Sequence, residues 1–333
     1  MILVTGGRGF LGGAIVAMLR ESGQQVRSLA RHHSSVLEKM GVEQLVGDLS
    51  DLSLVRQAIS GCDLVYHVAA KAGVWGAYAD YYRSNVVGTQ HVLTACRQTG
   101  VARLVYTSSP SVVFNGDNME GVDEKVPYPD HFHAYYPQTK ALAEQQVLAA
   151  NSDQLATVAL RPHLIWGPGD NHLVPRILER GRKGQLRRVG SGNNLVDTIY
   201  IDNAARAHLQ AAAVLAPGSA VAGKAYFIAN DEPLPLWDIV NQILAAGNVS
   251  PVTRTISPKL AYMAGSLLEF VYRTFRLSGE PRMTRFVARE LATAHWFDLS
   301  AAKRDFGYHP EVSIEEGMRR LRSWLQQENS GEA

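Results

Sequence analysis

The sequence predicts an α/β protein in which helices cover both faces of a parallel sheet, with a smaller C-terminal lobe interleaved with it. Two observations lead to this prediction. Between residues 1 and 165, short β-rich apolar runs alternate with helical patterns, and such repeats form doubly wound parallel sheets. Beyond Gly167, helical patterns are separated by segments rich in glycine and proline. The carboxyl ends of the predicted strands are therefore where ligands are expected.

The elements of the first part follow in regular order. Strands are expected at ILVTG, QQVRSLA, EQLVGDL, DLVYHVAA, ARLVYTSS and ATVALRP, with helices at GGAIVAMLRESG, LSLVRQAIS, NVVGTQHVLTACRQTG and TKALAEQQVLAAN. We assign residues 1–165 to the first domain and 166–330 to the second lobe. Tyr200–Asn203 and Tyr226–Asn230 are interpreted as strands, so that segments near 195–210 and 224–230 return to the first domain. The final residues, 329–333, are expected to form a frayed tail.

Composition excludes several classes of protein. The chain has 333 residues, and 33 Lys and Arg against 31 Asp and Glu give a net charge of +2, so no nucleic-acid partner is expected. Cys62 and Cys96 lie far apart without metal-ligand spacing, which predicts reduced thiols, no metal site and a cytoplasmic protein. The first strand begins at Met1, so we expect no cleaved leader.

No run of 18 or more uncharged apolar residues occurs, so a membrane-spanning helix is not expected. The nearest candidate is the helical pattern from Lys259 to Arg276, which Glu269 and Arg273 interrupt. Two interpretations remain open for it. It is either an amphipathic helix packed on the small lobe, or a helix that makes peripheral contact with a membrane or guides an apolar substrate.

A glycine-rich turn follows the first strand directly and opens a helical pattern. Glycines let the backbone turn sharply and approach a pyrophosphate, so this strand–turn–helix order indicates a Rossmann-like dinucleotide-binding site. We therefore assign residues 1–165 to dinucleotide binding, with these cofactor contacts in the turn: Gly6, Gly7, Arg8, Gly9, Phe10, Leu11 and Gly12.

The end of the second strand predicts the type of cofactor. Sites that prefer NAD usually carry an acidic residue there, for the ribose 2′-hydroxyl. Here the strand ends in Ala30 and is followed by Arg31, with Arg8 as a second cation. We expect NADP(H) because guanidinium groups bind a 2′-phosphate. The alternative is that Arg31 is only a solvated loop residue.

Two further strand ends supply candidate cofactor contacts. Asp48 and Leu49 follow the third strand, where a carboxylate can accept a hydrogen bond from the adenine amino group. Asp48 alternatively caps the next helix. After the fourth strand, small residues let the backbone run beside the cofactor, which adds Ala69, Ala70 and Lys71.

Three residues indicate dehydrogenase chemistry. Tyr136 and Lys140 stand four apart at the start of a helical pattern, on one face of it. A nearby lysine charge, together with the cofactor charge, is expected to lower the tyrosine pKa toward neutral pH, where the phenol exchanges a proton with a substrate oxygen. Ser109 follows the fifth strand and is placed to orient that oxygen.

These motifs, with ALRPHLIWGPGDN and YIDNAARAH, resemble those of the extended short-chain dehydrogenases/reductases, and over nearly the whole chain their 3β-hydroxysteroid dehydrogenase branch. The resemblance implies that Ser109 is the catalytic hydroxyl, Tyr136 the acid/base, and Lys140 the group that binds nicotinamide ribose and tunes the tyrosine.

The same resemblance implies further roles for individual residues. It implies that Asn85 helps to hold the active-site helix and that the backbone at Arg161 and Pro162 runs beside the nicotinamide. It also implies a homodimer, formed by the helices that start near Asn85 and Tyr136.

Within that branch, KAGVWGAYADYYRSNVVGTQHVL and RDFGYHPEVSIEEGM are similar to segments of the bacterial reductases of long-chain olefin biosynthesis. This implies NADPH-dependent reduction of a long-chain 2-alkyl-3-ketoalkanoic acid to the 2-alkyl-3-hydroxy acid. Assembly with other enzymes of the olefin pathway stays open. The substrate carboxylate needs a donor, for which the sequence offers, without ranking, His163, His172, Arg176 and Arg285.

Other functions remain as alternatives. The same residues suit a 3β-hydroxy-4-carboxysterol dehydrogenase, or a nucleotide-sugar epimerase or dehydratase. A redox sensor or scaffold that has lost catalysis is disfavoured because serine, tyrosine and lysine are all present. The apolar stretch LAYMAGSLLEFVY favours a long-chain or polycyclic substrate over a sugar nucleotide.

Overall fold

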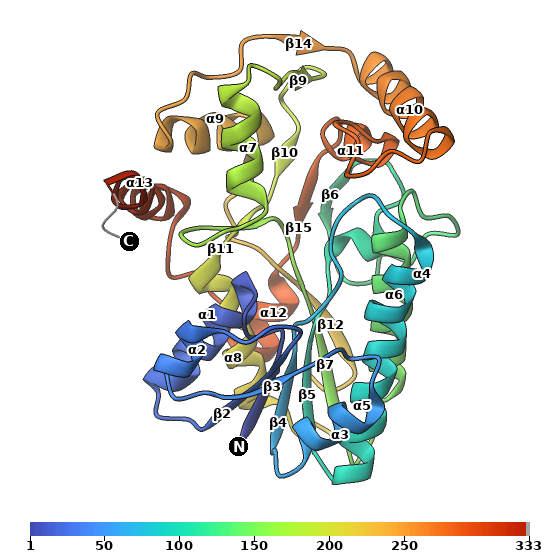
Figure 1. The fold of residues 1–333 in the computed structure, drawn as a ribbon, viewed down its shortest axis with the longest axis vertical. Coiled ribbons are helices and arrows are strands. Elements are labelled where there is room, and N and C mark those ends of the chain that lie inside the picture. The colour runs from blue at the N-terminus through green and yellow to red at the C-terminus, as the bar shows by residue number, and fades with distance from the viewer. Residues whose placement is uncertain (331–333) are drawn as a thin grey trace.

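A computed structural model describes residues 1–330 and places a seven-stranded parallel sheet at the centre of the molecule (Figure 1). The strand order is β12-β7-β5-β4-β1-β2-β3, so the order reverses between β1 and β4, where a ligand site is expected. This confirms the doubly wound, Rossmann-like fold class. The strands are β1 (Ile2–Thr5), β2 (Val26–Ala30), β3 (Glu43–Val46), β4 (Leu64–His67), β5 (Arg103–Thr107), β7 (Ala156–Pro162) and β12 (Lys224–Ile228).

Helices cover both faces of this sheet (Figure 1). On one face α1 (Phe10–Glu21) packs against α8 (Ile201–Val214), and on the other α3 (Leu52–Ile59) packs against α5 (Gly88–Thr99), with α6 (Tyr135–Ala149) beside it. The central apolar runs predicted as strands are buried between these layers, as in β7, where every residue is buried, whereas the edge strand β3 has no buried residue. Shorter helices are α2 (Ser35–Lys39), α4 (Tyr78–Tyr81), η1 (Tyr82–Val87), η2 (Pro110–Val113) and α12 (Ser300–Phe306).

A smaller lobe lies beyond the carboxyl ends of the strands and contains a mixed sheet in the order β13-β10-β15-β6. Its strands come from distant parts of the chain: β6 (Met119–Val122), β10 (Leu195–Val196), β13 (Leu234–Pro235) and β15 (His295–Phe297). Two parallel pairs flank it, β8 (Ile165–Trp166) with β11 (Ile199–Tyr200), and β9 (Arg188–Val189) with β14 (Thr255–Ile256). The helices of this part are α7 (Leu173–Arg182), α9 (Leu236–Ala246), α10 (Pro258–Thr274), α11 (Arg285–Glu290) and α13 (Ile314–Ser330).

The chain passes repeatedly between the two parts. Strand β12 adds to the large sheet beside β7, while β6 precedes residue 165 and pairs with β15 of the small lobe. The division at residue 165 therefore stays a prediction.

One predicted strand is wrong: within Tyr200–Asn203 only Tyr200 belongs to a strand, and helix α8 begins at Ile201. The run that follows is rich in alanine, which favours a helix, and Asp202 lies in its first turn, where a negative charge is stabilised.

Two other expectations can be compared with the structure. Residues 329 and 330 end α13 instead of fraying, and residues 331–333 of the expected tail lie outside the described part of the chain.

The helix expected between Lys259 and Arg276 is present as α10, and it packs against α11. It packs on the lobe as the first interpretation expects, through Ala261, Gly265 and Glu269 with the partly buried Tyr262, although most of its larger apolar side chains stay exposed. Among residues 1–330, no helix is both long and apolar enough to cross a membrane.

Candidate active site

The predicted cofactor site begins where the chain turns from β1 into α1. Gly6 has a φ of +71°, which glycine adopts without strain. A Cβ at Gly12 would lie 2.2 Å from the Gly6 carbonyl oxygen, so the helix can approach the turn only because a glycine is there. Gly9 caps α1 without a side-chain hydrogen bond. The first N–H groups of the helix are thus left to a ligand, and a pyrophosphate fits them.

Of the other turn residues, some are packed against the protein and one is exposed to solvent. Leu11 is buried, and a Cβ at Gly7 would lie 2.6 Å from the Ser28 hydroxyl oxygen. Arg8 is exposed, and within residues 1–330 it makes no hydrogen bond or ion pair. A cation in this state suits a phosphate ligand.

Arg31, Asp48 and Arg83 share one corner of the site. Arg31 is exposed at the end of β2 and, among the described residues, has no hydrogen-bond or ion-pair partner. A backbone hydrogen bond from Ser50, with the charges of Arg83 and Arg31, lowers the pKa of the Asp48 carboxyl below its usual value. Asp48 therefore remains ionised beside Arg31, so this corner holds both charges that were assigned to the adenosine end of the cofactor.

The alternative interpretation of Asp48 as a helix cap is wrong. The carboxylate of Asp51 caps α3, accepting from Ser53 N at 2.9 Å and Leu54 N at 3.1 Å. Asp48 instead accepts from Ser50 N at 2.9 Å, which closes the turn after β3. Its second oxygen is thus available to a ligand.

A buried histidine fixes the segment after β4. Thr5 Oγ1 lies 2.8 Å from His67 Nδ1 and accepts from the backbone N–H groups of Val68 and Ala69. Burial lowers the His67 pKa to about 3, so the ring is neutral and acts as a hydrogen-bonding bridge, reaching Thr89 Oγ1 at 2.9 Å. The sequence analysis missed this role, because only the adjacency of Thr5 and His67 on paired strands discloses it.

Asn85 connects the cofactor side to the predicted catalytic helix. Its side chain accepts from Lys71 N at 2.7 Å and donates to Lys71 O at 3.1 Å and to Thr139 Oγ1 at 3.0 Å. Asn85 lies in the π-helix η1, a geometry that often marks functional sites. One buried amide thus sets the distance between the loop after β4 and α6.

Lys140 is buried below the end of β5. Its ammonium group donates to Thr107 O at 2.5 Å and lies 4.0 Å from the centre of the Tyr106 ring. Burial lowers the Lys140 pKa to about 7. A group in this position suits the ribose hydroxyls of a nicotinamide cofactor, as the sequence resemblance implied.

Tyr136 and Ser109 line one cleft, and they come from α6 and from the loop after β5. The expected lowering of the Tyr136 pKa by Lys140 is not found: burial raises it to about 12, and only the Ser109 side chain opposes this. The physical reason is that the Lys140 ammonium is directed at Thr107 and Tyr106. Tyr136 is consequently protonated at neutral pH, which suits a proton donor.

The serine loop has a defined geometry. Ser109 Oγ lies 2.9 Å from Ser111 Oγ and accepts from Ser111 N at 3.3 Å. Pro110 begins the short helix η2, where its missing N–H is not needed. Pro110 therefore leaves the Ser109 hydroxyl in the cleft.

A buried ion pair joins α6 to strand β7 of the large sheet. Arg161 in β7 contacts both carboxylate oxygens of Glu144, at 3.0 and 2.6 Å, and Tyr128 donates to the same carboxylate at 2.6 Å. Both charged side chains are almost fully buried. The sequence analysis used Arg161 and Pro162 only for their backbone, because nothing local shows that Glu144 faces β7. This pair anchors the helix that carries Tyr136 and Lys140.

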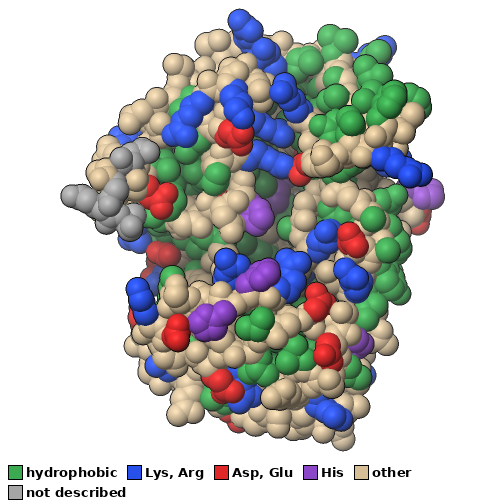
Figure 2. Space-filling view, in the orientation of Figure 1, with side chains coloured by type: hydrophobic (Ala, Val, Ile, Leu, Met, Phe, Trp, Pro, Cys, Tyr) green, Lys and Arg blue, Asp and Glu red, His purple; other side chains and the backbone are tan. Residues whose placement is uncertain are grey.

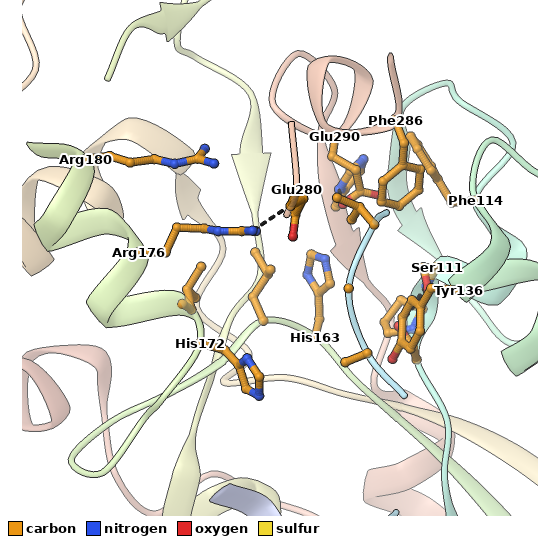
Figure 3. A pocket seen from close by; sticks show the side chains of 18 of the residues that line it. Ser111, Phe114, Tyr136, His163, His172, Arg176, Arg180, Glu280, Phe286 and Glu290 are labelled. Atoms are coloured by element: carbon orange, nitrogen blue, oxygen red, sulfur yellow. Dashed lines mark hydrogen bonds and ion pairs between the residues drawn. The ribbon is translucent and has the colours of Figure 1, made fainter. Parts of the chain in front are cut away.

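The cleft has a volume of about 860 Å³, and its composition differs from end to end (Figure 3). Figure 3 shows Tyr136 with Phe114 and Phe286 on one side, Arg176 and Arg180 on the other, and His163 between them. The apolar lining comprises Val74, Phe114, Met119, Leu164, Leu173, Phe286 and Phe297, and the basic lining comprises Arg176, Arg180, Lys183 and Arg282. The cleft can therefore hold an apolar substrate that also carries an anionic group.

Of the four residues considered as donors to a substrate carboxylate, three line the cleft and one does not. His163, His172 and Arg176 line the cleft, whereas Arg285 is absent from its lining and donates to Glu269 at 2.9 Å. Arg176 pairs with Glu280 at 2.6 Å. Arg180, which the sequence analysis did not select, has no ion-pair partner within residues 1–330, and burial beside Arg176 lowers its pKa.

Three cleft residues could hold a metal ion, although none is expected from the sequence. One ligand atom each of His163, Glu290 and His295 lies within 4.8 Å of the others. Burial keeps both imidazoles neutral and raises the Glu290 pKa to about 8.

Comparisons with known proteins agree with this geometry. The 3-beta hydroxysteroid dehydrogenase/isomerase family matches residues 3–257. The 2-alkyl-3-oxoalkanoate reductase of Stenotrophomonas maltophilia is 55% identical over 97% of this chain and 98% of its own. The mouse decarboxylating sterol-4-alpha-carboxylate 3-dehydrogenase is 35% identical over 95% of this chain and 88% of its own.

Among solved structures, MoeE5 in complex with UDP-glucose and NAD matches with a TM-score of 0.76 and 25% identity, covering 98% of this chain and 99% of MoeE5. The family match spans the glycine turn, the serine loop and the tyrosine–lysine helix described above, and the resemblance found in the sequence is thereby confirmed. The chain belongs to the 3-beta hydroxysteroid dehydrogenase/isomerase family of extended short-chain dehydrogenases/reductases.

Proposed function

We propose that this protein uses NADPH to reduce the 3-carbonyl of a long-chain 2-alkyl-3-oxoalkanoic acid, giving the 2-alkyl-3-hydroxy acid of olefin biosynthesis. The observation that carries the proposal is the cleft in which apolar side chains surround the hydroxyls of Ser109 and Tyr136. The relative from Stenotrophomonas maltophilia, which covers nearly the whole chain, supports this substrate.

In the proposed mechanism, each residue acts on the substrate oxygen or holds the cofactor. Ser109 donates a hydrogen bond that orients the carbonyl, and Tyr136, protonated at neutral pH, gives its proton to the developing alkoxide. Lys140 holds the ribose near the tyrosine. When bound, the nicotinamide supplies the hydride. The protonated phenol is the form of Tyr136 that the reduction step needs.

The preference for NADP over NAD rests on two exposed cations. Arg8 and Arg31 lie near the expected ribose end without a partner in the described chain, and Ala30 stands where an acidic residue would repel the 2′-phosphate. The pyrophosphate would be held by the start of α1. The adenine would be held near Asp48 and Leu49.

The assembly state follows by analogy and from exposed aromatic residues. Tyr78, Tyr82 and Tyr135 are exposed, and the Tyr78 ring contacts the other two at the start of the helices on which family members pair. A homodimer at η1, α5 and α6 would cover them. Cytoplasmic localisation and assembly with other olefin-pathway enzymes stay predictions.

The proposal can be tested in the oxidative direction, because a 3-oxo acid loses carbon dioxide in solution. The purified protein is given NADP with a 2-alkyl-3-hydroxy acid, a 3β-hydroxy-4-carboxysterol or UDP-glucose. NADPH formation is followed for the first two substrates, and UDP-glucose is analysed for epimerised or dehydrated product, because those reactions return the hydride and form no net NADPH. Stereoselective turnover of the hydroxy acid is the expected result. Turnover of the sterol alone, which the mouse relative favours, or action on the sugar nucleotide alone, would replace the proposed substrate.

A further inference from the structure

Three cleft residues that the proposed mechanism does not use, His163, Glu290 and His295, lie close together. His163 follows β7, Glu290 ends α11 and His295 begins β15, so three separate elements contribute to the group. Figure 3 shows His163 and Glu290 in the cleft. Figure 2 shows that the molecular surface is hollowed between its two parts, with histidine side chains in the hollow. An ion from solvent can therefore reach this group.

A hydrogen bond fixes which nitrogen of His163 carries the proton. His163 Nδ1 lies 2.7 Å from the carbonyl oxygen of Asp197, which can only accept a hydrogen bond, so Nδ1 is the donor. The lone pair of the neutral ring is consequently on Nε2. The Phe297 ring packs edge-on against this imidazole, with ring centres 5.2 Å apart, and holds its orientation.

His295 is held in the same manner through its other nitrogen. Thr293 donates its hydroxyl hydrogen to Arg289 O at 2.8 Å, so the same hydroxyl must accept from His295 Nε2, also at 2.8 Å. The lone pair of His295 is therefore on Nδ1, the atom that lies 3.8 Å from Glu290 Oε2. Histidines that bind metal ions are held in this way, with one ring N–H donated to a neighbouring oxygen and the other nitrogen left to the ion.

The spacing within the group suits an intervening ion. The 3.8 Å between His295 Nδ1 and Glu290 Oε2 exceeds the length of a hydrogen bond, and within residues 1–330 the Glu290 carboxylate takes part in none. Two ligands of a tetrahedral zinc ion, each about 2.0–2.2 Å from the metal, lie about 3.3–3.6 Å apart. All three ligand atoms lie within 4.8 Å of one another, so a shift of about 1 Å in the partly exposed Glu290 side chain would complete the geometry.

We propose that His163, Glu290 and His295 bind one divalent transition-metal ion such as Zn²⁺, and that its fourth coordination position faces the cleft and takes the carboxylate of the substrate. Two imidazoles and one carboxylate form a zinc site with one open position, whereas Ca²⁺ and Mg²⁺ prefer oxygen ligands alone. The ion would neutralise Glu290, which when ionised repels an anionic substrate, and would leave one net positive charge. The metal site is independent of the proposed function, and only the binding of the substrate carboxylate rests on it.

The first test is metal binding by the full-length protein, freed of metal by dialysis and titrated with Zn²⁺ against a chromophoric chelator. One equivalent per chain should bind. Glu290→Gln, which keeps the size of the side chain, and His295→Ala should each weaken binding at least about a hundredfold, because a ligand is lost. His172→Ala, at an exposed cleft histidine outside the group, is the matched control and should bind Zn²⁺ as wild type.

A further variant tests the fixed ring of His295. Thr293→Val keeps the shape of the side chain but cannot accept from His295 Nε2, so Zn²⁺ binding should weaken about 10–100-fold. Circular dichroism checks that each variant is folded. The proposal is overturned if the wild-type protein takes up no Zn²⁺, or if Glu290→Gln and His295→Ala both bind it like wild type, which would place the ion on other histidines.

The open position is tested with Co²⁺ in place of Zn²⁺, because the visible absorption of Co²⁺ depends on its ligands. A short, water-soluble 2-alkyl-3-hydroxy acid should change this spectrum, and the matching alcohol without a carboxyl group should not. An unchanged spectrum with the acid would overturn the binding of the carboxylate to the metal. If Zn²⁺ uptake depends on Glu290 but the hydroxy acid is not oxidised, the metal site stands and the proposed function fails.

Discussion

The sheet half, which is the parallel sheet with the expected cofactor site, and the cleft half, which is the smaller lobe over the cleft, are built in different ways. In the sheet half, a buried chain of hydrogen bonds runs through Thr5, His67 and Thr89 beside the expected cofactor. In the cleft half, Arg180 lacks an ion-pair partner among the described residues, and the apolar face of α10 is exposed. The difference teaches that the buried floor of the cofactor site is organised before a ligand arrives, whereas the groups left for ligands lie at the exposed rim, as Arg8 and Arg31 do, and in the cleft, as Arg180 does.

The largest expected effect is on chemistry at the boundary of the two halves. Tyr136→Phe removes the proposed proton donor and should lower kcat by about 10²–10⁴-fold. The affinity for NADPH, measured by fluorescence titration, should remain because the glycine turn is untouched. Tyr135→Phe is the matched control, since Tyr135 is exposed and does not line the cleft. Equal rates in the two variants would remove Tyr136 from the mechanism.

The next effect tests how strongly the sheet half depends on its buried charges. Glu144→Ala leaves Arg161 buried without its carboxylate and should lower the free energy of unfolding by about 3–5 kcal/mol. Glu179→Ala removes an exposed partner of Lys183 and should change it by less than about 1 kcal/mol. Urea denaturation followed by circular dichroism measures both. Similar values for both would mean that burial of the Arg161 pair is unimportant for stability.

A smaller effect is expected at the exposed corner of the cofactor site. Arg31→Ala should reduce kcat/KM for NADPH about 10–100-fold and leave that for NADH nearly unchanged, because a charge-assisted contact to the 2′-phosphate is lost. Arg56→Ala, at an exposed arginine of α3 outside the predicted site, serves as control. An equal loss with both cofactors would argue against Arg31 as the source of specificity.

The smallest expected effect is the dependence of reduction on pH. Since burial raises the Tyr136 pKa to about 12, the phenol stays protonated through the neutral range and causes no fall in the reduction rate there; a fall near pH 7 would reflect Lys140, whose pKa burial lowers to about 7. Oxidation needs the phenolate and should become faster as pH rises, by up to about tenfold per pH unit. Initial rates in both directions over the same buffers measure this. A phenolate absorbance that appears near neutral pH in the wild-type protein and is missing in Tyr136→Phe would show that Tyr136 loses its proton there.

The two halves also differ in how far the sequence could predict them. The strands of the large sheet and the glycine turn follow from local patterns, and the structure confirms them. The Glu144–Arg161 pair and the cluster of His163, Glu290 and His295 unite residues far apart in the chain, so no local pattern could predict them.

Tertiary contacts also decide what spacing alone left open. The direction of the Lys140 ammonium depends on Thr107 and Tyr106, and the close packing of Gly265 against Thr284 sets which side of α10 is buried. The first contact overrides the expectation that Lys140 lowers the Tyr136 pKa, which was drawn from spacing alone.

The central claim is transfer of hydride to the 3-carbonyl carbon of a 2-alkyl-3-oxo acid. It is tested most directly with NADPH deuterated at the transferable position and freshly prepared 2-alkyl-3-oxoalkanoic acid, with mass spectrometry of the product. The account predicts a 2-alkyl-3-hydroxy acid that carries one deuterium at C3 and a single configuration there. A product without deuterium, or only the decarboxylated ketone at its uncatalysed rate, would contradict the account.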